Sequence, residues 1–270
     1  MTKVIVCGAC GRMGSKIAQL VSQNKEMELV GVIERDDHPD IGKNLTYLPL
    51  LAVVKNENIE GLIGAMGPDV IVDFTNPEAT LKHLEIAAKY KKAVVIGTTG
   101  LKKEHITQVK ELAKESPCVM APNMSQGVNL LFKLVKEVAM TLPGYDAEIV
   151  ESHHNQKKDA PSGTAYKLAE EIALGYADAD PENAKNRVLS HGRQGIIGPR
   201  KAEEIGIHSI RAGDIVGEHT VIFAGPGERI ELIHRAHSRD AFAYGAIKAA
   251  KWIVGKPAGL YDMRDVLGIK

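Results

Sequence analysis

The chain has 270 residues, more than the usual ~100–150 of one domain, and with 44% hydrophobic and 25% charged residues its composition is that of a globular protein. The 34 basic residues balance 34 acidic ones, which leaves no overall positive charge for nucleic acid or an anionic membrane. No apolar run approaches the ~18 residues needed to cross a bilayer, and three cysteines, an odd number, argue against a disulfide framework, so we expect a cytoplasmic protein.

Strands and helices alternate along the first half of the chain. Residues 3–7 form a short β-branched run that ends at a glycine, residues 12–22 carry apolar side chains at helical spacing, and residues 28–34 predict a second strand. Residues 35–58 are polar and rich in turn residues, and we expect loop with short structure there.

Three more apolar runs in this half have the composition of strands that are buried on both faces of a parallel sheet. They span residues 70–74, 93–96 and 118–121, with helices expected over 76–90 and 101–115. Asn76 and Pro77 are typical of the cap and the first position of a helix. The alternation predicts a doubly wound, Rossmann-type parallel sheet.

The second half of the chain has a different rhythm. A helix over residues 128–142, a strand over 146–152 and a helix over 164–174 precede three runs with a period of two, at 205–211, 215–223 and 229–237. Turn residues separate these runs and predict an antiparallel meander, and helix is expected again over 241–254 and 261–267. The predicted fold is α/β, with a Rossmann-type domain over residues 1–125, to which 238–270 return, and an α+β domain with a largely antiparallel sheet over 126–237.

The glycine loop after the first strand predicts a dinucleotide site. Its sequence, Gly8-Ala-Cys-Gly-Arg-Met-Gly14, has the spacing G-x-x-G-x-x-G rather than G-x-G-x-x-G, but the helix that follows still offers amide donors to a phosphate. Glu34 ends the second strand at about the 20-residue offset of the acid that binds the adenine ribose. Arg35 adds a guanidinium for a 2′-phosphate, so we expect both NADH and NADPH to bind.

Two cysteines in this region have a C-x-x-C spacing, which also suits a redox pair or half of a zinc site. The remaining cysteine, Cys118, has no such partner. We therefore interpret Cys7 as the end of a buried strand and Cys10 as a filler of the glycine loop.

Two further loops come directly after predicted parallel strands. They are Gly97-Thr-Thr-Gly100 and Ala121-Pro-Asn-Met124. Loops at the carboxyl ends of such strands surround the ligand crevice of an open α/β sheet, and small hydroxyl residues suit a close approach to the nicotinamide.

The segment at residues 151–164, with the sequence ESHHNQKKDAPSGT, concentrates the side chains that can do chemistry. Its histidines and lysines suit proton transfer and the binding of carboxylates, and Ser162-Gly163-Thr164 offers amides to an anion at the start of a helix. His153 and His154 are adjacent and would point to opposite sides of an extended strand. Because no carboxylate or cysteine stands at ligand spacing from them either, no metal is expected.

These motifs together resemble the 4-hydroxy-tetrahydrodipicolinate reductase (dihydrodipicolinate reductase) family of the diaminopimelate route to lysine. The resemblance covers nearly the whole chain, and the pattern H-H-x-x-K-x-D-A-P-S-G-T is highly specific to that family. It rests on GACGRMG at 8–14, Glu34-Arg35, DFT at 73–75, GTTG at 97–100, APNMSQGVN at 121–129, ESHHNQKKDAPSGTA at 151–165 and RAGDIVGEHTVIF at 211–223.

The resemblance implies an NAD(P)H-dependent oxidoreductase that reduces a cyclic, unsaturated dicarboxylate to tetrahydrodipicolinate with loss of water. It implies a dinucleotide-binding first domain and a second domain that binds the substrate and assembles a homotetramer through its sheets. His153 would be the proton donor or acceptor and Lys157 a proton donor, while the substrate-binding residues would be His154, Gly163 and Thr164. The cofactor-binding residues would be Gly8, Ala9, Cys10, Gly11, Arg12, Met13, Glu34, Arg35, Gly97, Thr98, Thr99, Ala121, Pro122, Asn123 and Met124.

Two other readings of the sequence remain open at this point. Another Rossmann amino-acid dehydrogenase would share the N-terminal half, and a non-catalytic protein that senses NAD(H) would keep the glycine loop and Glu34. Neither would need the histidines and lysines of residues 151–164. The role of His219 is left open.

Overall fold

The computed structural model describes residues 1–46, 48–181 and 187–269. By their internal contacts these residues form two units, one of Met1–Gln126 with Asp240–Ile269 and one of Gly127–Arg239. Within the described ranges no helix is both long enough and apolar enough to cross a bilayer.

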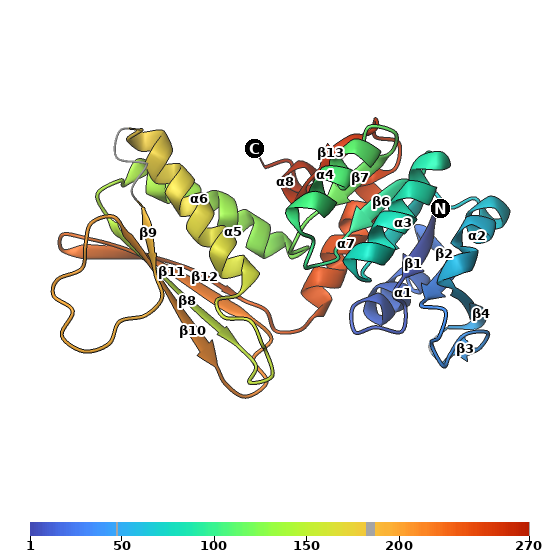
Figure 1. Cartoon of the computed structure of the whole chain (residues 1–270), viewed down its shortest axis with the longest axis horizontal. Helices are drawn as coiled ribbons and strands as arrows, with labels where there is room; N and C mark the ends of the chain where they lie inside the picture. Colours follow the sequence, from blue (N-terminus) through green and yellow to red (C-terminus); the bar gives the residue numbers. More distant parts are fainter. Residues whose placement is uncertain (47, 182–186, 270) are drawn as a thin grey trace. The chain divides into compact units, whose positions relative to one another are not determined.

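The first unit is built on an eight-stranded sheet in the order β13-β7-β6-β5-β1-β2-β4-β3 (Figure 1). All of its paired strands are parallel except β3 and β4. Its strands are β1 (Thr2–Cys7), β2 (Met27–Glu34), β3 (Asn44–Leu45), β4 (Leu48–Lys55), β5 (Val70–Asp73), β6 (Ala93–Ile96), β7 (Pro117–Met120) and β13 (Gly259–Tyr261). Because the central strands β1, β5 and β6 are buried on both faces, their near-continuous apolar runs identify them in the sequence.

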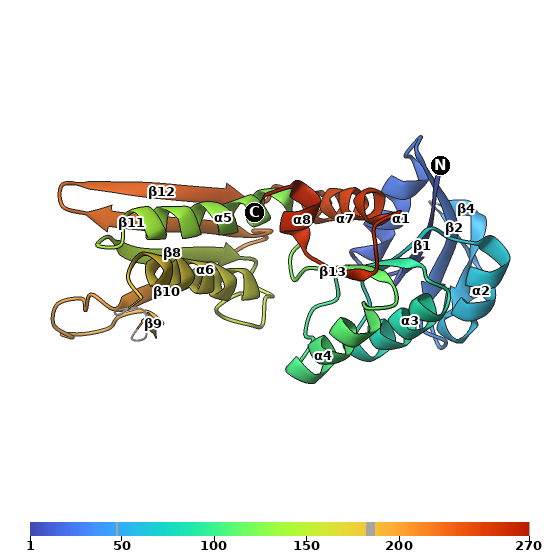
Figure 2. The same ribbon diagram turned by 90° about the horizontal axis from the view of Figure 1, so that it is seen from above.

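Helices cover both faces of this sheet (Figure 2). One core lies between the sheet and the helices α1 (Gly14–Ser22), α7 (Asp240–Ile253) and α8 (Met263–Leu267). The other lies between the sheet and α2 (Ile59–Met66), α3 (Pro77–Lys89) and α4 (Lys103–Leu112). The C-terminal segment therefore completes the core of the first unit. The predicted cap of α3 is confirmed, since the Asn76 side chain accepts a hydrogen bond from the Ala79 amide and Pro77 is the first residue of the helix.

One strand of this sheet contradicts the sequence-based prediction. Residues 35–58 were expected to be loop with short structure, which fits the two-residue β3 and the 3₁₀ helix at Asn56–Asn58, but Leu48–Lys55 forms the eight-residue strand β4. The run LPLLAVVK has no period of two, and a proline near its start argues against a strand. Its last part, from Val53 to Lys55, pairs with β2, whereas Leu48 and Ala52 pair with the two-residue strand β3 across an irregularity in register. The proline therefore lies outside the stretch that pairs with β2.

The second unit places two helices on one face of a five-stranded sheet of order β12-β11-β8-β10-β9 (Figure 1). The helices are α5 (Gln126–Thr141) and α6 (Gly163–Ala179), and the strands are β8 (Asp146–His153), β9 (Val188–Ser190), β10 (Glu204–Arg211), β11 (Glu218–Gly225) and β12 (Glu228–Arg235). Most of the paired residues are antiparallel, and the predicted α/β fold class with its two kinds of sheet is confirmed.

The predicted meander order is wrong. β8 lies between β10 and β11, so β10 pairs in parallel with β8, and only β11 and β12 form the expected hairpin. A period of two identifies a strand and its buried face but carries no information about its neighbours. β8 buries Ala147 and Ile149 completely, as suits a central strand.

Candidate functional site

The glycine loop of the first unit brings the start of α1 against the end of β1. Gly8 has φ +77°, which favours glycine, and a Cβ atom on Gly14 would lie only 1.9 Å from the Gly8 carbonyl oxygen. The first turn of α1 contains no acidic residue, and its N-cap residue, Met13, makes no side-chain hydrogen bond to it. The amides and the positive end of this helix can therefore meet the phosphate of a ligand.

Glu34 is fixed at the end of β2, whereas Arg35 is not. One Glu34 carboxylate oxygen accepts a hydrogen bond from the Cys10 amide at 3.1 Å, and the other accepts one from the Arg35 amide at 3.1 Å. The Arg35 side chain is 68% exposed, and its Nε lies 3.4 Å from a carboxylate oxygen of Asp37. An exposed ion pair of this kind is weak, so the guanidinium can turn toward a phosphate.

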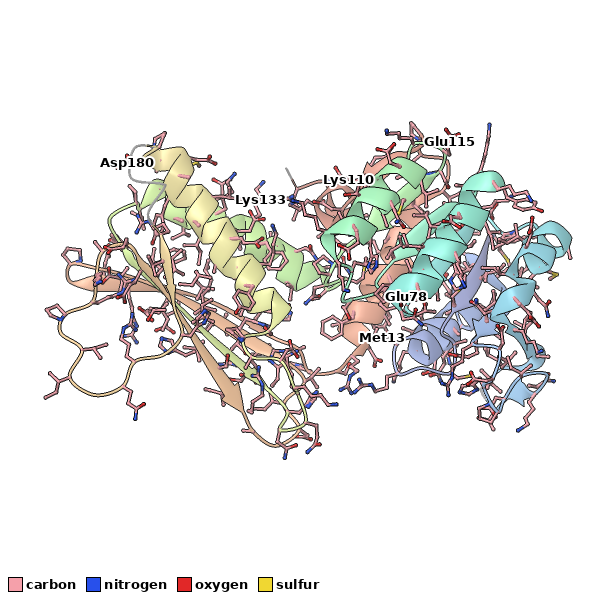
Figure 3. All side chains as sticks on the ribbon, viewed as in Figure 1. Met13, Glu78, Lys110, Glu115, Lys133 and Asp180 are labelled. Carbon is pink, nitrogen blue, oxygen red and sulfur yellow. The ribbon has the colours of Figure 1, made fainter. Side chains whose placement is uncertain are left out.

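Two neighbouring cavities bring most of the predicted cofactor residues together. The larger, of about 390 Å³, is lined by Gly11, Arg12, Met13, Phe74, Thr75, Gly97, Thr98, Thr99, Ala121, Pro122, Asn123, Met124 and Phe242. The smaller, of about 350 Å³, is lined by Gly8, Gly11, Ile33, Glu34, Arg35, Asp36, Asn56, Phe74, Thr75, Asn76, Glu78, Ala79 and Lys82. The two share Gly11, Phe74 and Thr75, and Figure 3 labels one lining residue of each, Met13 and Glu78.

Some residues of these cavities differ from the sequence-based set. Ala9 and Cys10 line neither cavity: Ala9 is buried in the core, and Cys10 contributes its amide to Glu34. Phe74 and Thr75 were not predicted, although they follow a strand at the same edge of the sheet as the glycine loop. Phe242 had no sequence signal, because it comes from α7, far along the chain.

A buried carboxylate, Asp73, holds two of the threonines that line the larger cavity. Its Oδ1 accepts hydrogen bonds from the Thr75 hydroxyl at 2.6 Å and from the Thr98 hydroxyl at 3.2 Å. Its Oδ2 lies 2.5 Å from Nδ1 of His83, and both side chains of this pair are fully buried. Burial by itself would lower the pKa of His83, but the neighbouring Cys7 and the Asp73 carboxylate raise that pKa to about 11. The pair is therefore an imidazolium and a carboxylate.

The second unit gathers its polar groups around another buried carboxylate, Glu151, on β8. Its Oε2 lies 2.6 Å from Nδ1 of His153 and accepts a hydrogen bond from Arg211 at 2.9 Å. Its Oε1 accepts hydrogen bonds from Arg211 at 2.8 Å and from the Ser162 amide at 3.2 Å. Burial would raise the pKa of Glu151, but the hydrogen bonds from His153 and Arg211 outweigh it and lower that pKa well below its usual range. Sequence reasoning missed both Glu151 and Arg211 as site residues.

The loop between β8 and α6 connects Lys157 to the same group of side chains. The Lys157 ammonium lies 2.8 Å from a carboxylate oxygen of Asp159, and the Asp159 carbonyl accepts a hydrogen bond from Arg211 at 2.6 Å. His154 follows the last residue of β8, and its carbonyl accepts a hydrogen bond from the Lys157 amide at 3.1 Å. His153 and Lys157 are thus linked through Glu151, Arg211 and Asp159.

The start of α6 follows this loop directly. Ser162 caps the helix by accepting a hydrogen bond from the Ala165 amide, and Gly163 and Thr164 are its first two residues. The Ser162 hydroxyl also lies 3.1 Å from Nε2 of His219, whose ring meets that of His153 edge-on at 5.4 Å. Burial, followed by the charge of His153, lowers the pKa of His219 to about 3, so this histidine stays neutral. His219 therefore belongs to the same group as the predicted residues.

In the described part of the chain, groups of side chains suited to a metal ion occur in two places. They are Cys7 with Asp73 and His83, and Cys10 with His38 and Asp40. The C-x-x-C motif is therefore divided between two groups rather than forming one site. Burial and the Glu34 and Asp40 carboxylates raise the pKa of Cys10 to about 11, so its thiol is protonated at neutral pH and is a poor metal ligand in that state.

Known proteins that are similar to this chain match it over nearly its full length. Family models described as Dihydrodipicolinate reductase, N-terminus and C-terminus, match residues 2–124 and 127–267. A 4-hydroxy-tetrahydrodipicolinate reductase of Syntrophus aciditrophicus (strain SB) is 50% identical over 273 residues, 100% of each chain. Its counterpart in Desulfotalea psychrophila is 51% identical over 100% of this chain and 99% of that protein. The solved structure of a dipicolinate-bound dihydrodipicolinate reductase from Paenisporosarcina sp. TG-14 has a TM-score of 0.78 and 31% identity, with 97% of each chain covered.

Proposed function

We propose that the chain, which belongs to the dihydrodipicolinate reductase family, reduces 4-hydroxy-tetrahydrodipicolinate to tetrahydrodipicolinate. The reductant in this proposal is NADH or NADPH. Membership makes it an oxidoreductase of the diaminopimelate route to lysine. The observation that carries the proposal is the linkage of His153 and Lys157, through Glu151, Arg211 and Asp159, beside the start of α6.

The first unit is proposed to bind the nucleotide along the two cavities. The smaller cavity, which contains Glu34 and Arg35, would take the adenosine end, and the larger, with Thr98 and Thr99, the nicotinamide end. When bound, the nucleotide supplies the hydride. The carboxylate of Glu34 suits the ribose hydroxyls of NADH, and the exposed guanidinium of Arg35 suits the 2′-phosphate of NADPH.

The second unit is proposed to bind the dicarboxylate and to transfer the proton. The amides of Gly163 and Thr164 at the start of α6, together with His154, would hold the carboxylates of the substrate. The relative whose structure contains dipicolinate supports a ligand of this class. Loss of water from the 4-hydroxy substrate gives a conjugated imine, and hydride addition to this imine leaves electron density on the ring. We assign the quenching proton to His153 and Lys157, and the Lys157 ammonium also stabilises the developing charge.

We further propose a homotetramer that assembles through the sheet of the second unit. The face opposite the helices carries Ile210 and Ile233, both 46% exposed, and the strand register places Val150 and Thr220 in one row with Ile233. Exposed apolar side chains on one face of a sheet are typical of subunit interfaces. The cytoplasm is the proposed location, because the three cysteines are free thiols.

A coupled assay tests the proposed reaction. The substrate is formed in place from pyruvate and aspartate semialdehyde, and oxidation of NADH or NADPH is followed by its absorbance. We expect oxidation that depends on all components. Folded protein that binds the nucleotide but leaves it unoxidised would point to a sensor. Oxidation that proceeds only with another imino or keto acid would instead indicate a different dehydrogenase.

A further inference from the structure

We propose that Glu151 is the positioning residue of the reaction, fixing His153 with its proton on Nδ1 so that Nε2 alone exchanges a proton with the substrate. The inference rests on the role proposed above for His153. Glu151 is fully buried on β8, and His153 follows it by two residues, so that both side chains lie on the same face of the strand.

The hydrogen bonds of Glu151 determine the tautomer of His153. An ionised carboxylate can only accept, and the pKa of Glu151 is held well below its usual range. Nδ1 of His153, at 2.6 Å from Glu151 Oε2, must therefore be the donor. With Nδ1 committed in this way, Nε2 is the ring atom that can take up or release a proton.

Gly217, just before β11, lies on the Nε2 side of the ring. A Cβ atom added to it would lie only 3.1 Å from Nε2, so a larger residue there would crowd this atom of a side chain that is 12% exposed. The charged and titratable groups around the pair are Arg211 on β10, His219 on β11, and Lys157 and Asp159 on the loop. His219 is neutral, and the Arg211 guanidinium balances the charge of the Glu151 carboxylate beside the ring of His153.

A role limited to holding the fold together would not require the contact with His153. Glu148, on the same strand, shows what such a role looks like: it binds Arg193, Arg200 and His208, and these hydrogen bonds overcome burial to lower its pKa to about 2. None of these three partners of Glu148 lies in the loop at residues 154–162. Glu148, whose side chain is 21% exposed, is therefore a control for the removal of a hydrogen-bonded carboxylate from β8.

The test compares Glu151→Gln with Glu148→Gln in the coupled assay, in H₂O and in D₂O. We expect Glu151→Gln to lower kcat by roughly 10²-fold, the lower end of the contribution of general acid–base catalysis, and to increase the solvent isotope effect as proton transfer becomes limiting. The Kd for NADH should be unchanged. Glu148→Gln should retain both kcat and the isotope effect. A Glu151→Gln protein that matched Glu148→Gln in both would overturn the inference.

Two further variants keep the test decisive. If Glu151→Gln does not fold, Glu151→Asp keeps the charge beside Arg211 but withdraws it from His153 by one methylene, and it should still lower kcat; an unchanged kcat would contradict the inference. In a His153→Gln background, Glu151→Gln should cause no further loss, because it acts through the missing imidazole. If the kcat of the double variant fell by the product of the two single-variant reductions, Glu151 would act by a route other than His153. If His153→Gln itself kept full activity, the proposed function of His153 would fail first, and this result is distinct from the others.

Discussion

Single carboxylates organise the proposed site at the scale of residues, and each accepts a hydrogen bond from a backbone amide of a loop that we propose to bind a ligand. Glu34 accepts a hydrogen bond from the Cys10 amide in the glycine loop, and Glu151 accepts one from the Ser162 amide at the start of α6. Glu34 thus connects the glycine loop to Arg35, and Glu151 connects the start of α6 to His153. Substitutions of the residues beside these carboxylates should lower activity or nucleotide binding. They should have little effect on folding where the substituted side chain is exposed.

The proposed proton-transfer residues give the first prediction. His153→Gln and Lys157→Ala should each lower kcat by roughly 10²–10⁴-fold, because the proton would then have to come from water. Lys158→Ala is the matched control, since Lys158 is the exposed neighbour of Lys157 and should keep normal kcat. Circular dichroism checks folding. Near-normal kcat in both folded variants would remove the proton-transfer roles from these two residues.

The second prediction concerns the choice of nucleotide. Arg35→Ala should raise the KM for NADPH far more than that for NADH, by about tenfold for each ~1.4 kcal/mol of lost phosphate interaction. Glu34→Ala should impair NADH more, because it removes the acceptor for the ribose hydroxyls and releases the Cys10 amide.

The control for this prediction is Lys43→Ala, which removes an exposed cation from the segment that follows β2 but lines neither cavity. KM is measured for both nucleotides in all three variants. Equal shifts for NADH and NADPH in Arg35→Ala would show that the guanidinium does not read the phosphate.

Elements of the first unit meet in the buried network around Asp73, which connects the end of β5, the loop after β6 and the middle of α3. Asp73→Asn should lower the free energy of unfolding by about 3–5 kcal/mol, because it leaves the His83 imidazolium buried without its partner. Urea denaturation measures the change. Glu85→Gln, which alters an exposed carboxylate on α3, should have little effect. A loss in Asp73→Asn no larger than in this control would mean that the pair does not stabilise the fold.

The buried pair of His83 and Asp73 also predicts how the free energy of unfolding depends on pH. The pKa of His83 is raised from 6.5 to about 11, so its contribution is complete below pH 6.5 and is lost as the pH rises through about 11. The pKa of Asp73 is lowered from 3.8, so its contribution is present above that pH and is lost on acidification. Between pH 6.5 and about 11 the free energy of unfolding should therefore fall more steeply in wild type than in Asp73→Asn. Parallel curves would indicate that His83 is neutral in the folded protein.

The features predicted correctly from the sequence are those that local patterns encode. The glycine loop, the cap of α3 and the strands buried on both faces each show within a few residues. The position of β8 between β10 and β11 does not show in any local pattern, because a period of two gives no information about which strands pair with each other. Arg211 reaches Glu151 across 60 positions of sequence, and Phe242 comes from the C-terminal helix, so neither could be assigned to the site from local pattern.

The whole molecule is proposed to be a tetramer, and the exposed face of the five-stranded sheet in the second unit allows a specific test. Ile233→Lys should yield species smaller than four times the 29.2 kDa chain in sedimentation experiments, because a charge on the face opposite the helices would have to be buried between subunits. Ile233 is exposed in the isolated chain, so the folding of the subunit should be unaffected.

The matched control is Leu174→Lys on α6. Its side chain is 47% exposed against 46% for Ile233, but it lies on the helix that covers the other face of the sheet. This variant should remain a tetramer. Dissociation of Leu174→Lys but not of Ile233→Lys would move the interface to the helices. A wild-type protein that sediments as a single chain would exclude the proposed assembly altogether.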